Sequence, residues 1–463
     1  MNSHSPQFFM SEALRLAEKA LFTTSPNPRV GCVIVQDGAI VGRGFHEKAG
    51  ESHAEVIALK EAGSQSEGSD VYVTLEPCSH TGKTPPCVDA LIEAKVKKVF
   101  IAMQDPNPIV SGRGIQKLKD AHIEVELGVM EAQAQLLNIG FISRMTKQLP
   151  YVRAKLAVSI DGKTALHNGK SQWITGDAAR ADVQYWRASS CAIITGIGTV
   201  LYDNPKLSVR LYEHARQPLR VVVDSELKIP LESDILLEKP LLIAYANDKQ
   251  KKLPQLKSLG IECIQLDDSG KVDLASLLKE LAKREVNEVW IEAGEGLNGA
   301  FLKANLIDEL MIYYAPVILG SEAKGMFTLP AFENLENKKI PLDSFFEKVI
   351  SENVTTKKPE NAFYIDYLWN KEDKTIEITK IVEKELAFFP IAENASLNNK
   401  VDEKKYQVTC SKGGKDVWTK VCDGKFSCGS LIYDCLEGGG CGTICSQRMI
   451  YIPESSEFVL IEL

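Results

Sequence analysis

The chain has 463 residues, a formal net charge of −8, 44% hydrophobic residues and 25% charged residues. These totals are ordinary for a soluble globular protein and leave room for two or three domains. The acidic balance argues against a general nucleic-acid binder, because affinity for phosphates needs a basic face. No stretch approaches 18 consecutive apolar residues and the start lacks a secretion signal, so we expect a cytoplasmic protein without a membrane span.

The first segment, residues 1–147, alternates helical and strand patterns. Apolar residues at a 3.6-residue spacing predict a helix over 8–21, and Asp37-Gly38 predicts the turn of a hairpin over 30–46. The other expected elements are helices over 54–63, 87–96 and 114–123 and strands over 70–77, 97–103 and 124–129. Such alternation favours a layered α/β sandwich.

The second segment, residues 148–369, follows a short join that contains Pro150 and repeats the same alternation. It opens with residues 151–165, and its strand-like stretches cover 191–197, 219–225, 240–246, 288–294 and 309–319. Helical patterns fill most of the gaps between them, which predicts a second α/β domain.

The third segment, residues 370–463, differs in composition. It holds six of the eleven cysteines, which are Cys410, Cys422, Cys428, Cys435, Cys441 and Cys445. Short strand candidates over 405–410, 431–435 and 458–463 predict a small, Cys-rich, β-rich tail. A disulfide framework would conflict with a reducing cytoplasm, and the spacings contain no C-x-x-C pair. An accessory module, an unrelated fused segment and a metal site all remain open for this tail.

One constellation in the first segment points to metal chemistry. His53 and Glu55 begin the helix expected over 54–63, Cys78 follows the strand over 70–77, and Cys87 begins the next helix. One imidazole and two thiolates supply three zinc ligands and leave the fourth tetrahedral position for water, whose pKa zinc lowers toward about 7. Glu55 can then carry the proton from that water to the substrate, as in zinc deaminases. We therefore predict one Zn²⁺ held by His53, Cys78 and Cys87, with Glu55 as the catalytic residue.

Each of these residues also has a plainer interpretation. A histidine at a helix start is usually a cap, and cysteines in α/β segments are usually small core residues. The eight residues between Cys78 and Cys87 exceed the usual spacing of a zinc knuckle, and a redox pair would need the C-x-x-C geometry. The zinc hypothesis depends on the conjunction of all four residues.

Five motifs in this segment carry a family resemblance: PNPRVGCVIV, GFHEKAGESHAEVIAL, VTLEPCSHTGKTPPC, DPNP and GRGI. Together they resemble the deaminase domain of the bifunctional bacterial riboflavin-biosynthesis deaminase–reductase, including its wide cysteine spacing. The resemblance implies a cytidine-deaminase-like α/β/α sandwich. It also implies that Asn27, His46 and Lys83 help to hold the substrate, although singly they would be turn or surface residues.

In the second segment, Gly294, Gly296 and Gly299 form a G-x-G-x-x-G pattern between a strand and a helix. A Rossmann interpretation is weak, because that fingerprint normally opens its domain. A Gly-rich turn before a helix can bind phosphate in any fold, and it can equally be a tight connection with no ligand.

Further motifs, AKLAVSIDGKTA, SQWITG, YWR, TGIGTVLYDNPKLSVR and VVVDS, resemble the reductase domain of the same family, which has a dihydrofolate-reductase-like α/β fold. The implied NADPH contacts are Ala157, Trp173, Thr199, Asp203, Ser225, Gly294, Glu295, Gly296, Leu297, Asn298, Gly299 and Ala300. The implied substrate contacts are Ser171, Arg187, Leu207, Arg210 and Glu292. The two arginines suit a ribose 5-phosphate, since guanidinium matches phosphate oxygens bidentately. Lys155 and Asp161 are further polar candidates near the reacting carbonyl.

The resemblance implies two successive reactions. The first is zinc-dependent hydrolytic deamination of 2,5-diamino-6-(5-phosphoribosylamino)pyrimidin-4(3H)-one. The second is NADPH-dependent reduction of the ribosyl group of 5-amino-6-(5-phosphoribosylamino)uracil to ribityl. We expect small-molecule substrates, no nucleic-acid or membrane partner, and a homo-oligomer, either dimer or tetramer. The alternatives are a zinc nucleobase or tRNA deaminase with an accessory domain, and a zinc scaffold without activity.

Overall fold

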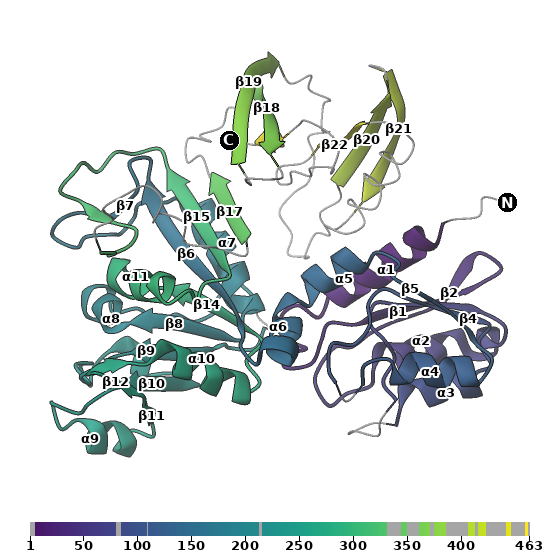
Figure 1. Cartoon of the computed structure of the whole chain (residues 1–463), viewed down its shortest axis with the longest axis horizontal. Coiled ribbons are helices and arrows are strands. Elements are labelled where there is room, and N and C mark those ends of the chain that lie inside the picture. Colours follow the sequence, from purple (N-terminus) through teal and green to yellow (C-terminus); the bar gives the residue numbers. More distant parts are fainter. Residues whose placement is uncertain are drawn as a thin grey trace, which may run out of the picture. The chain divides into compact units, whose positions relative to one another are not determined.

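The computed structural model of the chain describes residues 5–79, 85–108, 110–212 and 215–330 and seven strands beyond them (Figure 1). The chain divides into two compact units, Leu16–Glu352 and Met1–Arg15 with Asn353–Leu463. Within the described residues, every helix is too short or too polar to cross a bilayer. The domain boundaries expected near residues 147 and 369 stay predictions.

The first sheet of the larger unit is mixed and has five strands in the order β2-β1-β3-β4-β5. Its strands are β1 (Gly31–Gln36), β2 (Ala39–Phe45), β3 (Asp70–Val73), β4 (Lys98–Ile101) and β5 (Glu124–Leu127). The predicted hairpin is confirmed, because β1 and β2 pair antiparallel and Gln36 faces Ala39 across the Asp37-Gly38 turn. β3, β4 and β5 run parallel.

The helices of this part of the chain are α1 (Pro6–Glu18), within which the division between the two units falls, α2 (Ala54–Ala62), α3 (Cys87–Glu93), α4 (Arg113–Asp120), α5 (Glu131–Leu137) and α6 (Ile139–Lys147). The helices from α2 onward flank the sheet and form the predicted sandwich. α2, α3 and α4 lie along one face of the sheet, and α5 lies on the other (Figure 1). The sequence patterns predicted the first four of these helices but neither α5 nor α6.

Two glycines of β2 let α2 approach the sheet closely. A Cβ atom on Gly42 would lie 2.3 Å from the carbonyl oxygen of Ala58, and one on Gly44 would lie 2.1 Å from that of Ala54. Any side chain at either position would therefore push α2 away. Since α2 carries the start of the candidate zinc site, these glycines help to set its position.

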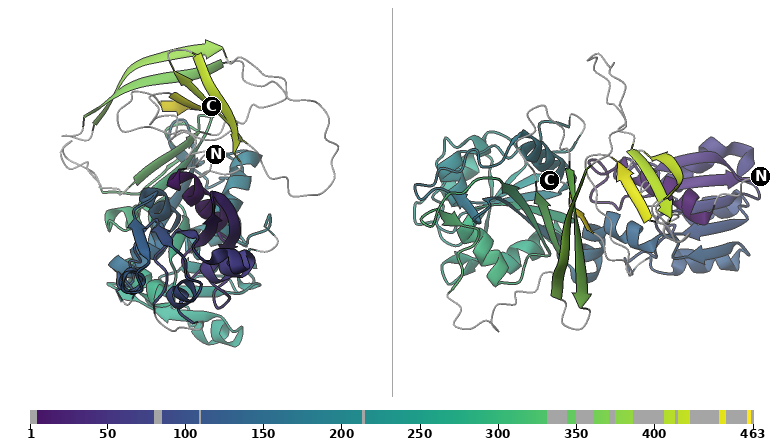
Figure 2. Two further views of the ribbon diagram at one scale, coloured as in Figure 1. Left: turned by 90° about the vertical axis from the view of Figure 1, so that its right-hand side faces the viewer. Right: turned by 90° about the horizontal axis from the view of Figure 1, so that it is seen from above.

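The second sheet is entirely parallel and has eight strands among the described residues, in the order β11-β10-β9-β8-β14-β6-β15-β17. Its strands in chain order are β6 (Tyr151–Ser159), β8 (Ala192–Gly196), β9 (Leu219–Val223), β10 (Leu241–Tyr245), β11 (Glu262–Gln265), β14 (Glu288–Glu292), β15 (Glu309–Ala315) and β17 (Ser344–Val349). The two sheets belong to separate bodies, purple to blue and teal to green, within the larger unit (Figure 2).

Helices cover both faces of this parallel sheet, as its βαβ crossovers require. They are α7 (Asp177–Ser189), α8 (Ile197–Asp203), α9 (Leu253–Ser258), α10 (Leu274–Lys283) and α11 (Glu295–Lys303). Ile194 packs on one face with Leu281 and Phe301, and its neighbour Ile193 packs on the other with Val183. Alternate residues of a strand point to opposite faces, so both faces need apolar side chains.

Short pairings complete the larger unit: β7 (Lys163–Ala165) with β16 (Lys324–Gly325), and β12 (Asp267–Asp268) with β13 (Lys271–Val272). The smaller unit contains two antiparallel three-stranded sheets. Their strands are β18 (Asn361–Asn370), β19 (Thr375–Glu385) and β23 (Val459–Ile461), and β20 (Tyr406–Lys412), β21 (Lys415–Cys422) and β22 (Cys441–Cys445). The strand expected over 431–435 lies outside the described residues.

Candidate active sites

Three predicted zinc ligands meet in the first α/β body. His53 is the N-cap of α2, Cys87 is the first residue of α3, and Cys78 follows β3 at the same end of the sheet. The His53 Nδ1 atom lies 3.1 Å from the Cys87 Sγ atom and 3.6 Å from the Cys78 Sγ atom. All three donor atoms lie within 4.8 Å of one another. The wide cysteine spacing in the sequence therefore closes into one compact cluster.

The chemistry of this donor set suits zinc. A backbone N–H of Cys87 donates to the Cys78 sulfur over 3.3 Å. Hydrogen bonding to Cys87 lowers the pKa of the Cys78 thiol, while hydrogen bonding to Cys78 and burial raise the pKa of Cys87. Two sulfurs and one imidazole are the ligands that zinc takes in deaminases, and the fourth position would remain for water.

Glu55 lies one residue inside α2 and is only 3% exposed. Burial raises the pKa of its carboxyl to about 7, and the neighbouring Cys78 adds to that rise. A carboxyl with a pKa near neutrality can both accept and return a proton, which is what a general acid–base residue needs.

The structure brings two of the three predicted substrate residues to this cluster. The Asn27 Nδ2 atom lies 2.9 Å from the His46 Nε2 atom, and the His46 ring lies edge-on to the His53 ring at 5.0 Å between centroids. Burial lowers the pKa of His46, so its imidazole stays neutral near pH 7. Lys83 lies outside the described residues.

Sequence reasoning missed Glu76, which lies two residues before the predicted zinc ligand Cys78 and organises the backbone of the DPNP and GRGI segments. Its carboxylate is 3% exposed and accepts backbone N–H groups of Asp105, Gly112, Gly114 and Ile115 at 2.9 to 3.2 Å. The DPNP and GRGI motifs were visible in the sequence. The sequence signal for their link to Glu76 was an acidic residue inside the strand expected over 70–77, directly before Pro77 and Cys78.

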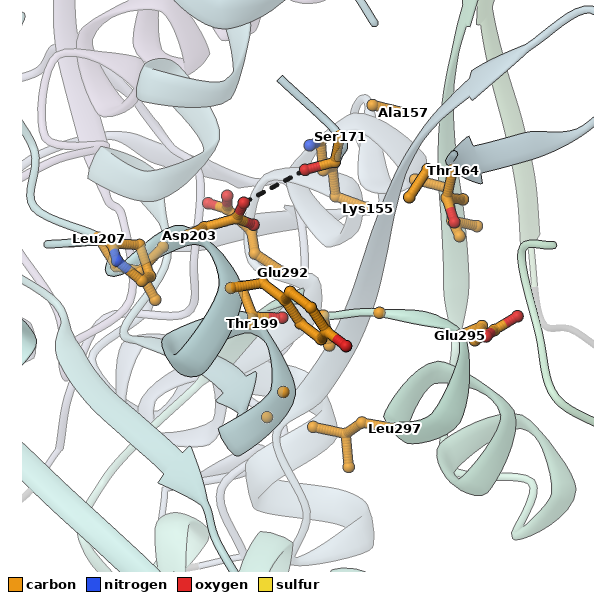
Figure 3. Close-up of a pocket in the computed structure, with 18 of the residues that line it drawn as sticks. Lys155, Ala157, Thr164, Ser171, Thr199, Asp203, Leu207, Glu292, Glu295 and Leu297 are labelled. Atoms are coloured by element: carbon orange, nitrogen blue, oxygen red, sulfur yellow. Dashed lines mark hydrogen bonds between the residues drawn. The ribbon is translucent and has the colours of Figure 1, made fainter. Parts of the chain in front are cut away.

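A second site is the cavity of about 1130 Å³ in the parallel-sheet body. Its lining includes the predicted reductase residues except Asn298 and Gly299. They are Ala157, Ser171, Trp173, Arg187, Thr199, Asp203, Leu207, Arg210, Ser225, Glu292, Gly294, Glu295, Gly296, Leu297 and Ala300. Figure 3 shows how residues from β6, α8, β14 and α11 converge on it. The sequence reasoning therefore gathered residues far apart in the chain into one cavity.

Glu292 ends β14 inside this cavity and is held in a fixed place. Arg187 donates from Nε and Nη2 to its two carboxylate oxygens at 2.6 and 2.8 Å, and Trp290 donates from Nε1 at 3.1 Å. Burial alone would raise the pKa of Glu292, but the Arg187 guanidinium lowers it below its ordinary value. Lys155 is half-buried nearby, and its loss of hydration lowers the pKa of its amine although Glu292 opposes the shift. The site thus sets a half-buried amine beside a carboxylate.

The cavity suits an anionic ligand. Arg210 is exposed, and within the described part of the chain its guanidinium has no ion-pair partner. The other positively charged residues that line the cavity are Lys155, Arg180, Arg187, Lys206, Lys271 and Lys324. The negatively charged residues that line it are Asp203, Asp234, Glu292 and Glu295. Ser171 donates to Asp203 over 3.3 Å (Figure 3). The excess of positive charge favours phosphate groups.

Glycine residues without side chains line the cavity at the start of α11. A Cβ atom on Gly294 or Gly296 would meet nothing within 4 Å, and both glycines line the cavity. This surface and the volume suit a dinucleotide whose phosphates approach the helix N-terminus. Asn298 and Gly299 face the protein instead: Asn298 donates to the Ala293 carbonyl, and a Cβ on Gly299 would lie 2.2 Å from the Thr328 carbonyl oxygen.

Asp161, the other polar candidate, is not among the residues that line the cavity. Its carboxylate accepts the Ser159 hydroxyl at 2.5 Å and the backbone N–H groups of Leu319 and Gly320 at 3.1 and 2.8 Å. It closes a turn beside β6.

The zinc-type cluster and the cationic nucleotide cavity together make the chain a bifunctional enzyme, a deaminase joined to a reductase. Residues 3–103 match the cytidine and deoxycytidylate deaminase zinc-binding region, and residues 150–350 match the RibD C-terminal domain. Riboflavin biosynthesis protein RibD of Escherichia coli K12 is 47% identical over 343 residues, which cover 71% of this chain and 92% of that protein. The chain belongs to the RibD family of riboflavin-biosynthesis deaminase–reductases.

Solved structures agree with this assignment. Acinetobacter baumannii RibD superposes with a TM-score of 0.66 at 46% identity. The superposition covers 72% of this chain and 92% of the Acinetobacter chain. A second match is the diaminohydroxyphosphoribosylaminopyrimidine deaminase/5-amino-6-(5-phosphoribosylamino)uracil reductase of Thermotoga maritima, with a TM-score of 0.63 at 31% identity. The superposition covers 84% of this chain and 100% of that one. The predicted fold classes of both α/β bodies are confirmed.

Proposed function

We propose that the first body deaminates 2,5-diamino-6-(5-phosphoribosylamino)pyrimidin-4(3H)-one. Zinc, when bound by His53, Cys78 and Cys87, would supply Lewis-acid activation of a water molecule. Glu55 moves the two protons of that water in turn, the first to the ring nitrogen and the second to the amino group, which then leaves as ammonia. Support comes mainly from the three donor atoms within 4.8 Å of one another beside this buried carboxyl.

Asn27, His46 and Lys83 hold the pyrimidine substrate in this proposal. For Asn27 and His46 the support is their hydrogen bond and the contact of His46 with the His53 ring. Both ring nitrogens of His46 already have partners, Nε2 with Asn27 Nδ2 at 2.9 Å and Nδ1 with the Ser52 carbonyl oxygen at 3.1 Å, so His46 acts by fixing the Asn27 amide beside the zinc cluster.

In the second body, the proposed reaction is reduction of the ribosyl group of 5-amino-6-(5-phosphoribosylamino)uracil to ribityl. NADPH, when bound along the α11 N-terminus, would supply the hydride. Lys155, beside Glu292, is placed to give a proton to the oxygen of the reacting carbonyl. We assign the 5-phosphate to Arg210, because the Arg187 guanidinium already donates to both oxygens of Glu292.

A Glu55→Gln variant tests the deaminase assignment. Without a carboxyl to move the proton, kcat for deamination should fall by about 100-fold or more. Zinc content measured by elemental analysis should stay at the wild-type value, since Glu55 is not a ligand. Reduction assayed by NADPH oxidation, with the deaminated substrate added directly, should not change and serves as the internal control. Deamination near the wild-type rate would contradict the proposal.

The homo-oligomeric state, the absence of a nucleic-acid partner and the cytoplasmic location stay predictions. The first follows only from the family resemblance, and the second from the acidic net charge of −8.

A further inference from the structure

Residues at the start of the reductase strand β14 contact the loop that carries Asn27. The Pro26 carbonyl oxygen accepts hydrogen bonds from Asn287 Nδ2 at 2.9 Å and from Arg144 Nη2 at 3.2 Å. Arg144 Nε in turn donates to Asn287 Oδ1 at 2.6 Å. The residue before Asn27 is therefore held from the reductase side and from α6.

The other side of Asn27 is held by Arg29. Its guanidinium lies 2.8 Å from a carboxylate oxygen of Glu288, and both side chains are nearly buried at 7% and 5% exposure. The same guanidinium donates to the carbonyls of Leu137 at 2.7 Å and Ser189 at 3.3 Å. Arg29 thus joins α5, the end of α7 and the start of β14.

Buried charges balance at this junction. Glu288 also pairs with Arg153 at 2.5 Å, and Arg153 pairs with Glu309 at 2.7 Å. Two guanidiniums therefore face two carboxylates, and the loss of one partner would leave a buried charge uncompensated. Gly140 of α6 packs so tightly here that a Cβ atom would lie 2.2 Å from the Glu288 Cγ atom. The junction is therefore a closely packed, hydrogen-bonded contact between the Asn27 loop and the start of β14.

We propose that Asn287 and Glu288, although they belong to the reductase body, are positioning residues for deamination. Asn287 holds Pro26, and Glu288 holds Arg29 two residues after Asn27, whose amide lies 2.9 Å from His46 Nε2 beside the zinc cluster. Small displacements of a substrate-holding group are costly, because binding geometry is lost before the chemistry begins. This inference rests on the proposed substrate role of Asn27.

The test compares Asn287→Ala and Glu288→Gln with wild-type zinc-loaded full-length enzyme. Each variant should raise the KM for deamination by about fivefold, the loss typical of one hydrogen bond, with kcat changed less than twofold. Zinc content should stay at the wild-type value. A structural collapse would instead lower kcat and zinc content together.

Glu309→Gln is the matched control, since it removes a carboxylate from the same charge network without touching the Asn27 loop. It should leave the KM for deamination at the wild-type value. An equal KM rise in this control, or no rise in Asn287→Ala and Glu288→Gln, would overturn the inference. Asn27→Ala distinguishes failure of the proposed function from failure of this inference. If Asn27→Ala leaves the KM for deamination unchanged, the proposed role of Asn27 fails. If it raises that KM while Asn287→Ala and Glu288→Gln do not, only the inference about Asn287 and Glu288 fails.

Discussion

At the scale of single residues, the two sites use charge in opposite ways. In the deaminase body, burial raises the pKa of the Glu55 carboxyl to about 7, so the group can both accept and release a proton near neutral pH. In the reductase body, Arg187 lowers the pKa of Glu292 and keeps it ionised despite its burial. The same side chain type is thus assigned proton transfer in the one proposed site and charge balance beside Lys155 in the other. Environment, and not residue type, separates these roles.

Arg210→Ala should weaken binding of the reductase substrate, because Arg210 is the cavity guanidinium that we assign to the 5-phosphate. A charge-assisted hydrogen bond contributes about 1.5–3 kcal/mol, so KM should rise by about 10-fold to 100-fold. Steady-state NADPH oxidation measures this. The rise should vanish with a substrate analogue that lacks the phosphate. Arg284→Ala, which removes a guanidinium paired with Glu262 and Glu280, is the control and should leave KM unchanged. An equal rise with the phosphate-free analogue would contradict the assignment.

At the scale of elements, the position of the zinc cluster depends on how closely α2 lies to β2. The contact is made through backbone, with Gly44 facing the Ala54 carbonyl at the first turn of α2. His53 and Glu55 stand on either side of Ala54. A shift of this turn would therefore move the predicted metal ligand His53 and the proposed proton carrier Glu55 together.

Gly44→Ala should lower both stability and zinc occupancy. The added methyl would lie 2.1 Å from the Ala54 oxygen and 2.7 Å from the Ala58 nitrogen, so α2 must move. Overpacking of this kind costs about 1–3 kcal/mol. Thermal unfolding and elemental analysis would show a lower midpoint and less than one zinc per chain. Gly325→Ala, where a methyl meets nothing within 4 Å, should change neither. Full zinc occupancy in Gly44→Ala would refute the role given to this contact.

The sequence predicted elements better than contacts. Period-2 and period-3.6 patterns identify the hairpin of β1 and β2 and helices such as α2, because those patterns reflect local geometry. Motif resemblance gathered the cavity residues, yet it could not show that Arg187 binds Glu292. That pairing joins residues 105 positions apart, and it is set by the order of strands in the sheet. Glu76 was missed for the same reason, since its partners lie 29 to 39 residues away.

At the scale of the whole molecule, β14 reaches from the deaminase body to the reductase cavity. Its first residue, Glu288, pairs with Arg29 of the deaminase body, and its last, Glu292, lies in the reductase cavity. A five-residue strand flanked by β8 and β6 is a rigid connection. Through Glu288 the reductase strand thus contacts the deaminase body, which is the contact on which the proposed positioning of Asn27 rests.

The buried carboxylates of β14 should also shape the acid stability of the protein. Burial raises the pKa of Glu288, but Arg29 and Arg153 outweigh it and bring the pKa below the ordinary value of 4.5. Below pH 4.5 the unfolded chain then binds more protons than the folded one, so stability present above that pH is lost as the pH falls toward the folded pKa. Thermal midpoints recorded from pH 7 to pH 3.5 should fall less steeply below pH 4.5 in Glu288→Gln than in wild type, from a lower starting value. Glu126→Gln removes an exposed carboxylate paired with Lys98 and should keep the wild-type slope. An unchanged slope in Glu288→Gln would mean that acid unfolding begins elsewhere in the chain.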